Sequence, residues 1–254
     1  MVSVLLMASC QWHGAPPESS DESDIIVVER FDRPESQYLT AADFASLHQM
    51  RTEYPLETRV LVEDVLKLGA VNSPDINTRL LVFFQDSTLQ ALIADVERQY
   101  KNMDDVNHAF TIAFGRLEQM IPGLKRPKIY AQVGSLDQSV VVSKELLGIS
   151  LDKYLGAEHP AYLRYGYTEE QRSMMTREYI VPDGLGFYLL SLYPFPQSAV
   201  ESDSLRRHHM MKIQCVVNKA MGRKVFSNDF IERMERLMAD RGMSVADFLS
   251  TDSI

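Results

Sequence analysis

The sequence predicts a mostly helical α+β domain with a small sheet, and three observations support this. Apolar residues recur with the period of an α-helix over most of the chain after residue 25. Short β-branched runs typical of strands are few, and two of them lie within residues 128–143. The composition, 45% hydrophobic and 24% charged over 254 residues, is that of one folded domain without a need for disulfides. We therefore predict a single α+β domain over residues 25–254, with a hairpin near residues 128–143.

The elements before the sheet are predicted from local patterns. Ile25 to Phe31 form a β-branched run that predicts a first strand. Thr40 is the expected N-cap of the first helix, and Asp86 or Ser87 caps a later one. Residues 79–84 are apolar but too short to assign between strand and helix. Helices are predicted at residues 40–54, 57–68, 87–101 and 104–120.

The second half begins with the predicted sheet. Residues 128–133 and 139–143 flank a Gly-Ser-Leu-Asp turn, which predicts the two strands of the hairpin. The remaining segments have helical periodicity. Helices are predicted at residues 170–179, 183–192, 205–219, 228–240 and 245–249.

The chain begins with a short apolar run that ends at Cys10. Residues 5–9, Leu-Leu-Met-Ala-Ser, place small side chains directly before the cysteine, as a signal peptidase requires, and the thiol can then carry diacylglycerol. The run is shorter than the roughly 7 to 15 apolar residues of a complete signal peptide and lacks a preceding basic residue. We interpret residues 1–10 as a truncated lipoprotein signal. The competing interpretation is a soluble protein whose first residues are apolar by chance.

Residues 11–24 are predicted to be a disordered acidic tether, because their prolines and carboxylates cannot form a core. Acyl chains on Cys10, palmitate among them, would hold the protein on a membrane. No apolar run after residue 10 approaches the roughly 18 residues of a membrane span. The net charge of -9 disfavours nucleic acid as a partner. We therefore expect a protein that is held at the membrane through lipid.

A loop-like segment at residues 147–162 is dense in glycine, aromatic and polar residues, a composition typical of binding sites. Asp152 is expected either to bind loop amides or to hold a ligand. Asp183 follows Pro182 and matches a helix-capping residue. Paired carboxylates here could also act as acid and base on a glycosidic bond. The predicted ligand or partner contacts are Asp152, Tyr154, Glu158, His159, Tyr162 and Asp183.

Several motifs of this chain resemble the GldB family of gliding-motility lipoproteins. The sequence Ile-Ser-Leu-Asp-Lys-Tyr-Leu-Gly at residues 149–156, then Tyr162 and residues 179–183, resembles the central block of that family. Residues 83–86, residues 126–130 and Cys10 are similar to it too. The resemblance spans residues 25–195, and beyond them only residues 222–226 are similar to the family.

This resemblance implies an envelope lipoprotein of the gliding and secretion apparatus of certain bacteria with two membranes. It implies no catalytic activity. We expect such a protein to act through contacts with other envelope proteins, and we favour the outer over the inner membrane as its location.

The order of helix, strand, hairpin and helix also resembles zincin-type metallopeptidases, whose metal is bound by His-Glu-x-x-His on a helix. The segment in the corresponding place, residues 179–192, contains no histidine. We therefore predict no metal and no cofactor. The alternative is a membrane-tethered, divergent metallohydrolase that uses His159 or His208 with Asp152 or Glu158. A third hypothesis is a glycan-binding lipoprotein, which the tyrosines of residues 154–188 favour.

Overall fold

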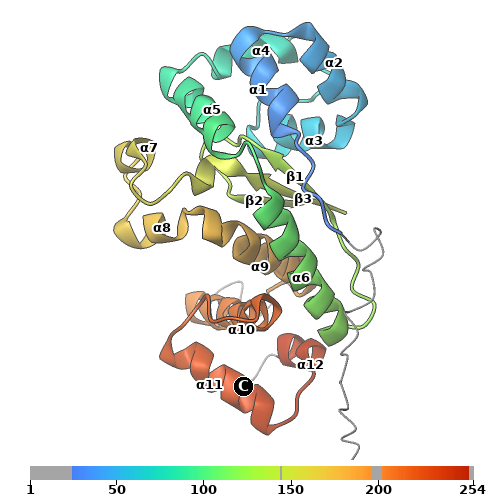
Figure 1. Cartoon of the computed structure of the whole chain (residues 1–254), viewed down its shortest axis with the longest axis vertical. Coiled ribbons are helices and arrows are strands. Elements are labelled where there is room, and N and C mark those ends of the chain that lie inside the picture. The colour runs from blue at the N-terminus through green and yellow to red at the C-terminus, as the bar shows by residue number, and fades with distance from the viewer. Residues whose placement is uncertain (1–24, 144, 196–201, 252–254) are drawn as a thin grey trace, which may run out of the picture.

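The computed structural model describes residues 25–143, 145–195 and 202–251. The predictions for Cys10 and for the tether lie outside these residues. The described chain is mostly helical, with a small mixed sheet in its middle, as the sequence predicts. Figure 1 shows helices α1–α5 on one side of the sheet, α6 and α9 on the other, and α10–α12 at the far end. Buried apolar side chains from all of these parts belong to one hydrophobic cluster.

The sheet has three strands in the order β1-β3-β2, namely β1 Lys128–Gln132, β2 Val140–Ser143 and β3 Leu146–Ser150. Both predicted strands are present, but the predicted hairpin between them is wrong. Strand β3 lies between them, parallel to β1 and antiparallel to β2. All five residues of β3 are buried, so this run occupies the centre of the sheet. Gly148 allows close packing there, since a Cβ atom at this position would lie 2.5 Å from Tyr130 Oη.

The N-terminal helices differ from the prediction mainly at their ends. The predicted first strand is reduced to a single parallel bridge between Glu29 and Tyr130. Thr40 is no N-cap, because it lies inside the first helix, whose C-cap is Ala42 in the left-handed region. Asp43 caps the next helix instead, and Asp86 caps α5 as predicted. The elements are α1 Asp32–Ala41, α2 Phe44–Thr52, α3 Pro55–Arg59, the π-helix Val60–Val65, α4 Ile76–Phe83 and α5 Ser87–Gln99.

Two helices cover the other side of the sheet. Helix α6 Asp104–Met120 contacts α9 Ile180–Leu192, and α9 contacts β2 and β3. Gly184 lets α6 and α9 approach, since a Cβ atom there would lie 3.0 Å from the ring of Phe110. The predicted helix at residues 170–179 is divided, because α8 ends at Met174. Between β3 and α9 lie the 3-10 helix Leu151–Tyr154, α7 Pro160–Arg164, α8 Glu169–Met174 and the 3-10 helix Arg177–Tyr179.

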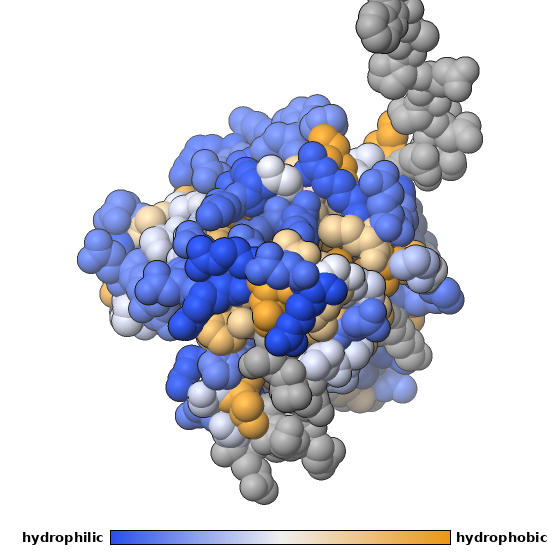
Figure 2. All heavy atoms as spheres, turned by 90° about the horizontal axis from the view of Figure 1, so that it is seen from below, coloured by the Kyte–Doolittle hydropathy of each residue, from blue (hydrophilic) through white to orange (hydrophobic). Residues whose placement is uncertain are grey.

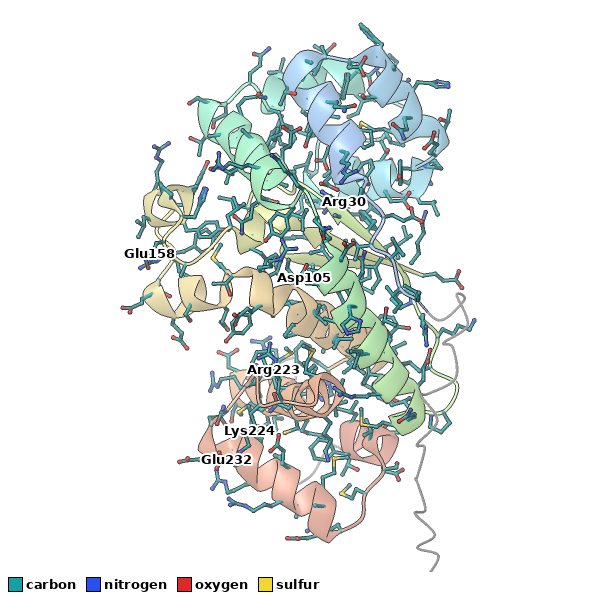
Figure 3. All side chains as sticks on the ribbon, viewed as in Figure 1. Arg30, Asp105, Glu158, Arg223, Lys224 and Glu232 are labelled. Atoms are coloured by element: carbon teal, nitrogen blue, oxygen red, sulfur yellow. The ribbon has the colours of Figure 1, made fainter. Side chains whose placement is uncertain are left out.

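The last helices, α10 Asp203–Met221, α11 Asp229–Asp240 and α12 Val245–Ser250, pack on α9 and α6 through α10. Asn218 fixes the turn between α10 and α11, accepting the backbone amides of Val225 and Phe226 at 2.9 and 3.0 Å. Within this turn, Lys224 forms an ion pair at 3.2 Å with Glu232 of α11 (Figure 3). Seen from this end, the coloured surface is largely hydrophilic with separate small apolar patches (Figure 2). Among the described residues, no helix combines the length and apolar character needed to cross a bilayer.

Candidate functional site

Asp152 is fully buried, and its carboxylate binds the loop that follows β1. Oδ1 accepts the backbone N–H of Gly134 at 2.8 Å and Oδ2 accepts that of Leu136 at 2.6 Å. Ser135 and Leu136 have φ angles of 56° and 64°, a left-handed turn that directs these amides toward the carboxylate. Burial raises the pKa of Asp152, and the two amides act against that rise. Of the two roles considered for Asp152, the structure shows the binding of loop amides.

Tyr162 is also buried and joins two backbone segments. Its hydroxyl donates to the carbonyl oxygen of Asp152 at 2.6 Å and accepts the N–H of Leu155 at 2.8 Å. Its ring lies between those of His159 and Tyr167, with centroid separations of 5.1 and 5.9 Å. Tyr162 therefore supports the loop and presents no free polar atom to a ligand.

Glu158 and His159 are neighbours in sequence but face different partners. Glu158 is 84% exposed and pairs with Arg172 at 3.1 Å. Figure 3 shows it at the outer edge of the molecule. His159 is the N-cap of α7, where Nδ1 accepts the N–H of Ala161, and its Nε2 lies 2.9 Å from Asp95 Oδ2. Both side chains are committed to structural contacts that the sequence pattern does not reveal.

Tyr154 and Asp183 come together from two different elements. The buried Tyr154 hydroxyl donates to Asp183 Oδ2 at 2.9 Å. The predicted capping role of Asp183 is wrong, because α9 begins at Ile180 and Asp183 belongs to its first turn. Burial raises the pKa of Asp183 to about 6, while the hydrogen bond from Tyr154 and the charge of Lys153 act in the opposite direction. Desolvation therefore dominates the environment of this carboxylate.

Asp183 and Tyr154 line a small pocket of about 170 Å³ between the 3-10 helix at residues 151–154, α8 and α9, which we call the Asp183 pocket. Lys153 Nζ lies 4.4 Å from the centroid of the Tyr167 ring. It donates to Tyr167 Oη at 3.0 Å and to the carbonyl oxygen of Leu136 at 3.3 Å. The other lining residues are Ser139, Gln171, Met174 and Met175.

Among these lining residues, the sequence predicts Tyr154 and Asp183 as contacts, and Tyr167 belongs to the tyrosines of the glycan-binding hypothesis. Lys153 lies beside Tyr154 in the distinctive octapeptide, which was the one available signal for it. Ser139 has no local signal, and the only local signal of Gln171 is the capping-box pattern with Thr168, which predicts a helix start and not a pocket. A larger open depression of about 760 Å³, beside the loop at residues 121–127, contains none of the six predicted contacts.

The residues of the metallohydrolase alternative are not brought together. His208 stacks on Phe230 with centroids 4.6 Å apart, and His209 Nε2 lies 2.7 Å from the carbonyl oxygen of Tyr193. Asp152, Glu158 and His159 have the separate partners given above. Within residues 25–143, 145–195 and 202–251, no group of three or more His, Cys, Asp or Glu side chains is arranged to bind a metal ion.

Comparison with known proteins identifies a family that the chain matches. A family model described as gliding motility protein GldB matches residues 15–205. The matched region contains the six predicted contacts and the whole lining of the Asp183 pocket, and it ends within the first turn of α10. No curated protein and no solved structure matches the chain significantly.

Proposed function

Because the chain belongs to the family of the gliding motility protein GldB, we propose that it is a non-catalytic envelope lipoprotein that acts by binding other envelope proteins. In this proposal a signal peptide is cleaved before Cys10, whose sulfur then carries the lipid, with palmitate among the acyl chains. The outer membrane is the proposed location. Each buried methylene of an acyl chain contributes about 0.8 kcal/mol, so two or three chains hold a protein at a membrane.

The observation that carries the protein-binding role is the surface beside the Asp183 pocket. Helices α7 and α8 project from the body at this side (Figure 1). They and the turn between them expose Leu163, Tyr165 and Met174 by 53%, 54% and 38%, and Met174 also lines the pocket. Tyrosine and methionine are enriched in protein interfaces, where apolar anchors surround a few polar contacts. We call these three side chains the α7–α8 surface.

Lipid attachment is tested by labelling cells of a native host with an alkyne-bearing palmitate. We expect label on the wild-type protein and on a Cys215→Ser variant, and none on Cys10→Ser. Cys215 is the matched control, because it is buried in α10. Equal labelling of the Cys10→Ser variant would remove the anchor from the proposal.

Protein contact is tested by crosslinking in the same cells, with adducts identified by mass spectrometry. We expect specific envelope proteins on the wild type, and a loss of about fivefold or more in a Leu163→Ser/Tyr165→Ser variant, as for loss of an interface anchor. Phe44→Ser is the control, because Phe44 is 77% exposed on α2, outside this surface. An unchanged adduct pattern in the double variant would contradict the proposed surface.

A further inference from the structure

We infer that the Asp183 pocket receives one lysine side chain of a partner protein, with its ammonium group on Asp183 Oδ1. This inference rests on the proposed function, since it names the chemistry of a contact beside the α7–α8 surface. It concerns a pocket to which family membership assigns no ligand.

The Asp183 carboxylate has the charge of Lys153 nearby but forms no ion pair with it. Within the described residues, the side chain of Asp183 forms no salt bridge, and its one hydrogen bond is the one that Oδ2 accepts from Tyr154. A partly buried carboxylate without an ion pair is unfavourable, because it has lost water without gaining a cation. Oδ1 is therefore the free acceptor at which a ligand cation would gain most.

The geometry favours lysine over arginine. Arginine binds carboxylates best through two parallel hydrogen bonds, one to each oxygen. Here Oδ2 already accepts the Tyr154 hydroxyl, so a guanidinium group would have to share this oxygen, whereas Oδ1 accepts no hydrogen bond from the described residues. A compact ammonium group suits one oxygen, and its other two N–H bonds need nearby acceptors. Ser139, which lines the same pocket, carries a hydroxyl oxygen that can accept one of them, and Gln171 Oε1, which already accepts the backbone N–H of Thr168 at 2.9 Å, has a second lone pair for the other.

The walls of the pocket suit an aliphatic stem. Met174 and Met175 contribute flexible thioether side chains, and Tyr167 contributes an aromatic ring. Lysine buries its four methylene groups along such surfaces while its charge meets a polar group. The volume of about 170 Å³ fits one side chain and no folded element.

Lys153 is the one cation among the lining residues, and its charge lowers the pKa of Asp183 without forming an ion pair with it. Its ammonium group bonds to Leu136 O and Tyr167 Oη and lies over the Tyr167 ring. The acceptors in these contacts are a carbonyl oxygen, a hydroxyl oxygen and an aromatic ring, and none of them is the Asp183 carboxylate. The pocket therefore retains a negative acceptor despite the nearby positive charge.

The ligand must bind the ionised form of Asp183, so its affinity should depend on pH. Tyr154 and Lys153 are the titratable groups that act on this carboxylate, and burial holds its pKa near 6. Binding of an ammonium group should weaken as the pH falls through this value, because protonated Asp183 offers no charge.

The test uses N-acetyl-lysine methylamide as probe and its norleucine analogue as the uncharged control, with binding followed by NMR of the methionine methyl groups of the purified protein. At pH 7.5 we expect the lysine probe to bind at least about fivefold more tightly than the analogue. We expect this preference to disappear at pH 5 and in Asp183→Asn. Glu170→Gln should retain it, since Glu170 is an exposed carboxylate of α8 outside the pocket.

Several outcomes would overturn the inference. They are equal binding of the two probes by the wild type, an unchanged preference in Asp183→Asn, and tighter binding of phosphoethanolamine than of the lysine probe. The last would assign the pocket to a lipid headgroup. Crosslinking of the wild type and of Asp183→Asn in cells, compared with the probe binding of the purified proteins, separates the two proposals. Partner capture without probe binding overturns the lysine inference alone. Probe binding without any partner overturns the proposed function, and with it the partner protein as the source of the lysine, and leaves only a preference of the pocket for an ammonium group.

Discussion

The carboxylate of Glu35 on α1 accepts a hydrogen bond of 2.9 Å from the backbone N–H of Val133, the residue directly after β1. The next amides along this loop, those of Gly134 and Leu136, donate to Asp152. Two buried carboxylates from opposite sides of the loop therefore hold residues 133–136. The loop leads to Ser139 at the Asp183 pocket, so the shape of the pocket depends on these bonds.

Replacement of Asp152 by alanine should destabilise the fold by about 3 kcal/mol. The change leaves the amides of Gly134 and Leu136 buried without acceptors, which costs more than the bonds themselves contribute. Asp152→Asn should lose less stability, because its side-chain amide oxygen can still accept one of the two backbone N–H groups. Urea denaturation measures the difference, with exposed Asp137→Ala in the same loop as control. A loss in Asp152→Ala no larger than in the control would contradict this role.

Glu35→Gln should become more stable relative to the wild type as the pH rises. Burial raises the pKa of Glu35 well above its ordinary value, so the folded state binds its proton more tightly than the unfolded state. Its contribution to the unfolding free energy is complete below about pH 4 and is lost as the pH rises through the folded pKa. Denaturation of both proteins from pH 4 to 9 measures this. A constant difference would show that Glu35 titrates normally.

Local signals in the sequence predicted elements well and contacts poorly. Asp86 precedes an apolar helical pattern and is found as the cap of α5. The prediction of a hairpin was wrong because the strand order depends on β3. All five residues of β3 are buried, and this strand lies between β1 and β2. Tyr154 and Asp183 were predicted as contacts from the composition of the segments around them. The hydrogen bond between them joins residues 29 positions apart, and no local sequence pattern predicts such a bond. The same holds for Glu35 and Val133, which are 98 residues apart.

Asn218→Ala should loosen the turn between α10 and α11. The Asn218 amide accepts two backbone N–H groups and donates to Phe226 O at 2.8 Å and to Glu235 Oε1 at 3.1 Å. All its hydrogen-bonding positions are used, so truncation should cost about 2 to 3 kcal/mol. Hydrogen exchange should show faster exchange at Val225 and Phe226 than in the control Ser227→Ala, whose side chain is exposed in the same turn. Unchanged exchange at these amides would mean that the turn is held by other contacts.

Asp183→Asn should stabilise the protein at pH 8 and leave it unchanged near pH 4. The folded pKa of about 6 lies above the ordinary value of 3.8, so the folded state again holds the proton more tightly. Stability from this group is present below about pH 4 and is lost as the pH rises to about 6. The shift corresponds to at most about 3 kcal/mol, and the partial exposure of Asp183 reduces this figure.

Urea denaturation of the wild type, Asp183→Asn and Glu170→Gln at pH 4, 6 and 8 measures this effect. Only the Asp183 variant should gain stability with pH, because Asn keeps the acceptor for Tyr154 without the buried charge. A variant less stable than the wild type at pH 8 would mean that the carboxylate contributes to folding. A gain, by contrast, identifies a group that costs stability in the free protein, as expected of a carboxylate retained for an incoming cation.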